Sequence, residues 1–205
     1  MSMSRNRAIA TSNERYPWLG HLFKAYRRTD SLSEEVIRET EAQTGKKVAC
    51  KKGCYQCCLK TDIPILEIEI AGISWYIKDR ISVEVRQELI RNLKDLTPMS
   101  PCPFLINNLC SIYPVRPLGC RNFLVLGIPC KPNEDIAVTR RHDIVPGRPD
   151  KHRKQVVPEV LAAMDIPVAH RKELAEKGHL PKIAKDLHSL NWASFAKILE
   201  SEESN

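Results

Sequence analysis

Eight cysteines constrain this chain more than any other feature of its sequence. All of them lie between Cys50 and Cys130, and the segments before and after contain none. Core packing rarely needs thiols at this density, and a protein of the reducing cytoplasm has little use for a disulfide framework. We therefore expect the cysteines to bind a metal.

The composition is that of a folded protein without a membrane segment. Hydrophobic residues make up 42% of the 205 residues and charged residues 28%, which excludes collagen-like and wholly disordered classes. No apolar stretch of about 18 residues is present, and residues 1–15 lack the apolar centre of a secretory signal. We expect a cytoplasmic protein with no membrane partner.

The first cysteine group lies in the run CKKGCYQCC. Cys54 and Cys57 have the two-residue spacing that brings successive thiolates onto one metal, and Gly53 permits the tight backbone this requires. Cys50 precedes them and Cys58 follows directly. Adjacent side chains point in different directions on most backbones, so Cys57 and Cys58 either serve two metals or divide between one metal and the core. This pattern favours a multinuclear or paired site.

The second group follows in the run PCPFLINNLCSIYPVRPLGC. Two apolar stretches flank Asn107-Asn108, a pair that tolerates positive φ, and this predicts a small hairpin carrying Cys102 and Cys110. Gly119 allows a close backbone approach just before the next cysteine. The predicted metal ligands of the whole chain are Cys50, Cys54, Cys57, Cys58, Cys102, Cys110, Cys120 and Cys130.

Charge balance predicts cations near these thiols. Eight thiolates around two divalent ions carry about −4, which is costly to bury without compensation. Arg116 and Arg121 flank Cys120, where a guanidinium group could donate to sulfur. The lysines beside the first group, Lys51, Lys52 and Lys60, are equally well explained as ordinary surface charges.

The two motifs together resemble the CxxCxxCC cysteine-cluster family, the YkgJ-like proteins described as a zinc- or iron-chelating domain. The resemblance covers about residues 48–123. Three residues rather than two separate Cys50 from Cys54, and Cys130 lies beyond the matched pattern. The resemblance implies an iron–sulfur or zinc site, and a related cluster occurs in flagellin lysine methylases. It rests on Cys50, Gly53, Cys54, Cys57, Cys58, Cys102, Phe104, Leu105, Cys110, Tyr113, Arg116, Pro117, Cys120 and Arg121.

Helical periodicity surrounds the cysteines. Residues 18–43 predict two helices with a break near Thr29-Asp30-Ser31, and residues 66–96 predict a helical pair in which Ser82 begins the second helix. Short helices are expected after Val156. We divide the chain into an N-terminal helical extension (1–47), a cysteine-cluster domain (48–130), a basic loop (131–155) and C-terminal helices (156–205). The fold class is mainly helical α+β, with a cysteine-rich hairpin and loops packed on helices.

The segment 131–155 is rich in cations and lacks a recognised nucleic-acid motif. A solvated loop is the favoured interpretation, and a nucleic-acid contact is the alternative. His142 and His152 could replace a thiolate as ligand, although surface histidines are favoured. The cations in this segment are Arg140, Arg141, Arg148, Lys151, Arg153 and Lys154.

Three function classes remain. The favoured one is a metal-binding protein with an iron–sulfur cluster or zinc, acting in electron transfer, metal handling or structure with a redox or assembly partner protein. The second is a cluster-dependent oxidoreductase or a methylase-like enzyme; the common nucleotide-binding and hydrolase motifs are missing, so the sequence leaves open whether the protein is an enzyme. The third is a zinc-ribbon-like adaptor for nucleic acid or protein, suggested by the net charge of +7.

Overall fold

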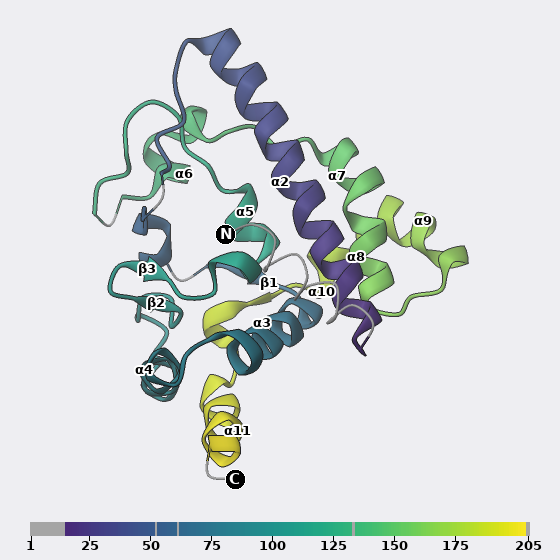
Figure 1. Ribbon diagram of the computed structural model, residues 1–205. Helices are drawn as coiled ribbons and strands as arrows, with labels where there is room; N and C mark the ends of the chain where they lie inside the picture. The colour runs from purple at the N-terminus through teal and green to yellow at the C-terminus, as the bar shows by residue number, and fades with distance from the viewer. Residues whose placement is uncertain (1–14, 52, 61, 133, 204–205) are drawn as a thin grey trace, which may run out of the picture.

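The computed structural model describes residues 15–51, 53–60, 62–132 and 134–203. Within them the long helix α2 (Pro17–Thr44) crosses the middle of the molecule, with α3 (Glu67–Arg80), α4 (Val83–Lys94) and the cysteine-bearing segments on one side. On its other side lie α7 (Pro149–Gln155), α8 (Val157–Ala163) and α9 (Val168–Glu176) (Figure 1). The mainly helical α+β class is confirmed.

The remaining elements are short. They comprise two antiparallel strand pairs, a set of brief helices and the C-terminal helix, which packs on α4. Their bounds are η1 (Gln56–Leu59), β1 (Pro64–Ile65), β2 (Leu105–Ile106), β3 (Leu109–Cys110), η2 (Tyr113–Val115), α5 (Leu118–Asn122), α6 (Ile136–Thr139), η3 (Arg141–Asp143), α10 (His179–Ile183), β4 (Lys185–Asp186), η4 (Leu187–Ser189) and α11 (Trp192–Glu203).

Helix α2 corrects the prediction of two helices over residues 18–43. It continues through Thr29, whose buried hydroxyl donates to the Ala25 carbonyl one turn earlier at 2.9 Å. That bond satisfies the polar side chain inside the helix. The apolar face that begins at Leu19 extends past the expected break to Leu32 and Val36. Burial of one continuous face against α8 and α5 therefore outweighs the weak helix propensity of Thr29, Asp30 and Ser31.

The predicted helical pair is present as α3 and α4, with Ser82 as the residue that begins α4. Just before α3, Pro64 and Ile65 form β1, which pairs antiparallel with Lys185 and Asp186 of β4. This contact joins the C-terminal region to the segment that follows the first cysteine group. The helices predicted after Val156 are present as α8 to α11.

One large hydrophobic core joins these elements. Leu19, Ile73, Leu89, Phe104 and Leu161 are fully buried, and they come from α2, α3, α4, the hairpin region and α8 respectively. A smaller cluster of Val36, Leu126 and Val145 lies under the far end of α2. Within the described residues, none of the helices is long and apolar enough to cross a membrane.

Candidate metal centre

The first cysteine group lies on a tight turn followed by a short 3-10 helix. Gly53 has φ of 82°, in the left-handed region that favours glycine, and the Cys54 amide donates to the Lys51 carbonyl at 2.9 Å. Cys57 and Cys58 both belong to η1. A 3-10 helix turns by about 120° per residue, but the two thiols still hydrogen-bond to each other, so they lie side by side rather than diverging as the sequence predicts.

Cys50 is attached to a different part of the chain. Its sulfur accepts a hydrogen bond from the Val125 amide at 3.4 Å, and the neighbouring Ala49 amide donates to the Val125 carbonyl at 2.8 Å. Val48 and Leu126 form an antiparallel bridge in the same stretch. Cys50 is thereby placed beside the segment that leads to Cys130.

The predicted hairpin is present as β2 and β3. Leu105 pairs with Cys110 and Ile106 with Leu109, and the two turn residues between them have φ of 49° and 60°. Cys110 therefore lies on the hairpin, whereas Cys102 precedes its first strand. The Cys102 amide donates to the Cys58 carbonyl at 2.7 Å, which joins the second cysteine group directly to the first.

Cys120 lies in α5, which is packed against β1. A Cβ atom on Gly119 would come within 3.0 to 3.2 Å of Pro64, including its carbonyl oxygen. This contact requires glycine and confirms the close approach that the sequence predicts. Glu69 of α3 holds the same junction, because its carboxylate accepts from the Leu118 amide at 2.7 Å and the Leu66 amide at 3.0 Å.

All eight cysteines are free thiols, and burial dominates their protonation. It raises the pKa of Cys102 to about 12 and raises the pKa of Cys120 above its usual range. The pKa of Cys110 and Cys50 is also raised by burial, and this effect is opposed by backbone N–H groups that donate to the sulfurs. Such thiols are protonated at neutral pH until a cation replaces the proton.

Cys57 behaves differently from the other thiols. A hydrogen bond from Cys58 lowers the pKa of Cys57 to about 7, and the same hydrogen bond together with burial raises the pKa of Cys58. The positive charge of Arg116 also lowers the pKa of Cys57. Cys57 is therefore the most readily ionised thiol at the point where the two groups meet.

The electrostatic neighbours of each thiol form two sets. The pKa of Cys50 is raised by burial and then by Cys54, Cys130 and Cys57. The pKa of Cys120 is raised by burial and then by Cys102, Cys57 and Cys110. The pKa of Cys58 is raised by a hydrogen bond to Cys57, by burial, and by the charges of Cys57, Cys102 and Cys110. Cys57 belongs to both sets. In the part of the chain that the structure describes, no three His, Cys, Asp or Glu side chains converge closely enough to hold a metal ion.

The donor set nevertheless fits a soft or borderline metal. Thiolates are the preferred ligands of zinc and of iron–sulfur clusters. A metal that displaces the protons also removes the cost of burying thiolates.

The two arginines beside Cys120 have different roles. Arg121 is only 4% exposed; it donates to the carbonyls of Arg116 at 2.9 Å and Pro114 at 2.6 Å and pairs with Asp30 of α2 at 2.7 Å. Its guanidinium also lies over the Tyr26 ring at 4.2 Å. Arg121 therefore fixes the backbone around α5 through oxygen acceptors, rather than through the sulfur contact that the sequence suggests.

Arg116 acts on the thiols through its charge. Its guanidinium lies 4.0 Å from the centroid of the Tyr113 ring, and it lowers the pKa of both Cys57 and Cys110. Among the lysines, Lys60 pairs with Asp135 at 2.9 Å and Lys51 is exposed. Lys52 lies outside the described residues.

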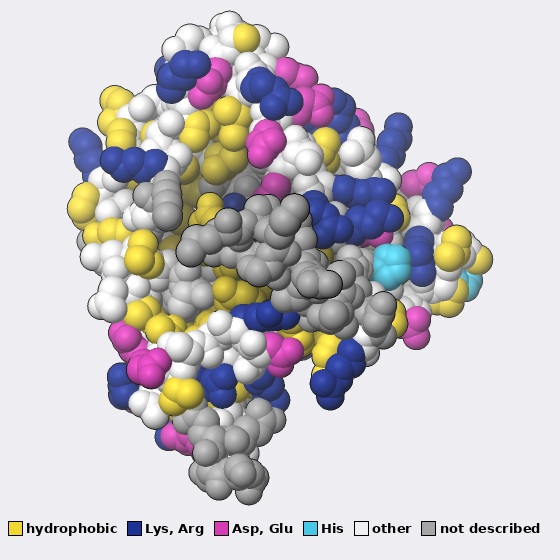
Figure 2. Space-filling view, viewed as in Figure 1, with side chains coloured by type: hydrophobic (Ala, Val, Ile, Leu, Met, Phe, Trp, Pro, Cys, Tyr) yellow, Lys and Arg dark blue, Asp and Glu magenta, His cyan; other side chains and the backbone are white. Residues whose placement is uncertain are grey.

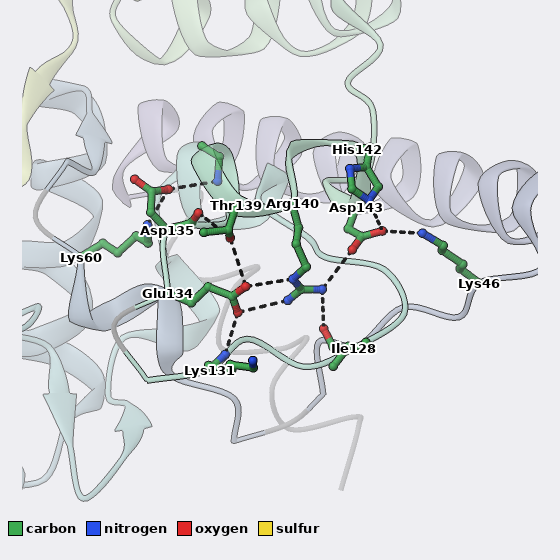
Figure 3. A network of polar contacts seen from close by, with 11 residues as sticks. Lys46, Lys60, Ile128, Lys131, Glu134, Asp135, Thr139, Arg140, His142 and Asp143 are labelled. Atoms are coloured by element: carbon green, nitrogen blue, oxygen red, sulfur yellow. Dashed lines mark hydrogen bonds and ion pairs between the residues drawn. The ribbon is translucent and has the colours of Figure 1, made fainter.

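Residues 131–155, expected as a loop, contain α6, η3 and α7 and are held by an ionic network (Figure 3). Arg140 is its centre: it donates to Glu134 at 2.9 Å, to Asp143 at 3.0 Å and to the Ile128 carbonyl at 3.1 Å. Lys46 pairs with Asp143 at 2.6 Å. The network places Glu134 and Arg140 close enough to Cys130 to influence its pKa, which burial raises.

Three other cations of this segment also make ion pairs. Arg148 pairs with Glu39, Lys151 with Glu35, and Arg153 with Asp150. The first two contacts attach the start of α7 to α2, whereas the third lies within α7. Periodicity alone did not predict them, because ion pairs between distant segments leave no local pattern.

Neither histidine candidate is among the groups named above as shifting the pKa of a cysteine. His142 is exposed and faces Asp143 at 3.6 Å, whereas His152 is half-buried in α7. Glu69, Tyr26 and Asp30 support the centre and were not among the predicted site residues. A lone acid or tyrosine on a helix gives no sequence signal of such a role.

Comparison with known families agrees with this geometry. Residues 49–142, a little under half of the chain, match the CxxCxxCC family model, described as "Putative zinc- or iron-chelating domain". This segment is similar to the CxxCxxCC family. The match includes Cys130, Glu134 and Arg140 and so continues beyond residue 123. No curated protein and no solved structure matches the chain.

Proposed function

We propose that this segment holds zinc or iron in two adjacent four-thiolate sites. The first site comprises Cys50, Cys54, Cys57 and Cys130, and the second comprises Cys58, Cys102, Cys110 and Cys120. The observation that carries this proposal is that the backbone attaches Cys50 to Val125, on the segment leading to Cys130, and Cys102 to Cys58, and the electrostatic neighbours of the thiols divide in the same way, with Cys57 shared. Cys58 interacts with Cys102 and Cys110, so we assign it to the second site and its neighbour Cys57 to the first.

The protein's own residues prepare both sites for negative charge. Backbone N–H groups of Val125, Phe104 and Ile112 donate to the sulfurs of Cys50, Cys102 and Cys110, and such bonds favour the thiolate. Arg116 adds a positive charge near the junction of the sites. Bound iron–sulfur clusters would supply one-electron transfer, whereas bound zinc would supply folding energy.

Exposed apolar side chains beside the thiols support a protein partner for the centre. Leu109 is 57% exposed, Tyr113 57% and Ile128 66%, and they neighbour Cys110 and Cys130 in sequence. Figure 2 shows hydrophobic side chains spread over the side of the molecule that carries the hairpin, whereas Lys and Arg gather over α2 and α8. Burial of this apolar surface would favour association with a redox or assembly partner.

The test is anaerobic purification followed by elemental analysis and a visible spectrum. Iron with acid-labile sulfide and a band near roughly 400 nm would identify clusters, and about two zinc ions without colour would identify closed zinc sites. Cys54→Ser and Cys120→Ser should each remove about half of the metal, whereas Ser111→Ala, beside Cys110, should retain it. Full metal content in both cysteine variants would refute the assignment.

A further inference from the structure

A cleft of about 740 Å³ lies between β1, α5, α7 and α10. Its wall is apolar: Ile65, Leu66, Val157 and Leu180 are all buried residues that line it. Its described lining contains no cysteine. Pockets of roughly 300–1,000 Å³ with apolar walls and a few polar groups are the usual sites of small-molecule binding.

One polar atom of a residue that lines the cleft lacks a partner. The Nε2 atom of His152 is buried and makes no hydrogen bond within the described residues. Buried polar atoms in native proteins nearly always have a partner. Burial lowers the pKa of His152, so the imidazole is neutral at pH 7 and has one N–H to donate. A ligand that supplies an acceptor would satisfy this atom.

The charges around His152 favour an anion. Arg148 and Arg153 lie on either side of it in the lining, and their ion pairs with Glu39 and Asp150 leave their side chains 38% and 42% exposed. A guanidinium group has five N–H donors, so each arginine retains donors after one ion pair.

The acidic side chains that line the cleft reduce its preference for an anion only slightly. Both carboxylate oxygens of Glu69 are engaged by backbone N–H groups, and burial raises the pKa of Glu69 to about 7. Glu176 is the other acid of the lining, and Lys177 beside it pairs with Glu173. The lining therefore holds the cations Arg148, Arg153 and Lys177 against the acids Glu69 and Glu176.

We propose that this cleft binds a small organic acid with an apolar body. Its carboxylate accepts from His152 and from the arginines of α7, and its apolar body lies against Ile65 and Leu180. Leu118 and Gly119 of α5 also line the cleft, so the bound acid contacts the helix that carries Cys120. The site is separate from the thiols and does not depend on which metal they hold.

Octanoate is a suitable probe, because it combines a carboxylate with an apolar chain of the required kind. The purified protein, with its metal content measured, is titrated with the fluorescent sulfonate 8-anilinonaphthalene-1-sulfonate, and octanoate or octylammonium is then added. We expect octanoate to displace the dye at least tenfold more effectively than octylammonium. Equal displacement by the two would overturn the proposal, because the polar end would then have no preference for an anion.

Two variants locate the binding site. His152→Ala should weaken octanoate binding about tenfold, whereas the matched control His142→Ala, at an exposed histidine outside the cleft, should not change it. Ala184→Trp should abolish binding by filling the cleft. Circular dichroism confirms that each variant is folded, and unchanged octanoate binding in a folded Ala184→Trp protein would show that the ligand binds elsewhere.

Discussion

The amide of Cys102 donates to the carbonyl oxygen of Cys58 at 2.7 Å. Both α3 and α4 lie between these residues in sequence, so the helical pair brings the second cysteine group back to the first. Because the bond is between backbone atoms, it survives replacement of either side chain. The scaffold can therefore be kept while single thiols are removed.

Cys57→Ser and Cys58→Ser should remove metal from different sites. Serine preserves the backbone of η1 but is a poor ligand for zinc or iron. We expect each variant to retain about half of the metal, and the double variant Cys57→Ser/Cys120→Ser to retain almost none. Elemental analysis of the purified proteins measures this. If Cys57→Ser/Cys120→Ser retained as much metal as either single variant, the two residues would belong to one site.

Gly119→Ala should destabilise the junction between α5 and β1. The added Cβ would lie 3.0 to 3.2 Å from Pro64, and overpacking of this kind costs about 1–3 kcal/mol. Gly147→Ala is the control, since a Cβ there meets nothing within 4 Å. Urea unfolding gives the free energy of each variant, and equal stability of the two would contradict the tight contact.

Glu69 should make stability depend on pH between about 4.5 and 7. Burial raises the pKa of its carboxyl group to about 7 in the folded protein, against an ordinary value of 4.5. In this range the folded state binds more protons than the unfolded state, so the free energy of unfolding falls as pH rises and levels off above 7. The decrease is on the order of 3 kcal/mol.

Glu69→Gln should abolish this part of the pH dependence and lower stability by about 1–3 kcal/mol, because the amide cannot accept both backbone N–H groups equally well. Glu67→Gln, at an exposed acid of the same helix, provides the control under identical conditions. Urea unfolding at pH 5 and pH 7.5 measures both. The same slope in Glu69→Gln and the control would show that Glu69 does not titrate in this range.

Arg140→Ala should weaken the first metal site selectively. Arg140 joins Glu134, Asp143 and the Ile128 carbonyl, and this network holds the segment on either side of Cys130. Without it, ordering Cys130 as a ligand costs additional conformational entropy. We expect metal content to fall toward half, with Arg141→Ala unchanged. Loss of metal from both sites in Arg140→Ala would indicate a general loss of structure instead.

Local patterns predicted much of this architecture. The hairpin at Asn107-Asn108 and the start of α4 at Ser82 follow from turn and helix signals that act within a few residues. The requirement for glycine at position 119 was also visible, although its partner Pro64 was not. The break expected near Thr29 was wrong, because helix propensity is weak and the continuous buried face of α2 decides the outcome.

The sequence by itself determined that eight thiols gather in the middle of the chain as candidate metal ligands, because thiol density and CxxC spacing are properties of the chain alone. The tertiary structure decided which thiols are neighbours: Val125 places Cys50 near Cys130, and the Cys102–Cys58 bond joins the two groups. It also decided that Arg121 binds oxygen atoms and that Arg148 and Lys151 form ion pairs with distant acids of α2. These contacts join residues far apart in sequence, and only the packing of α2 against α5 and α7 brings them together.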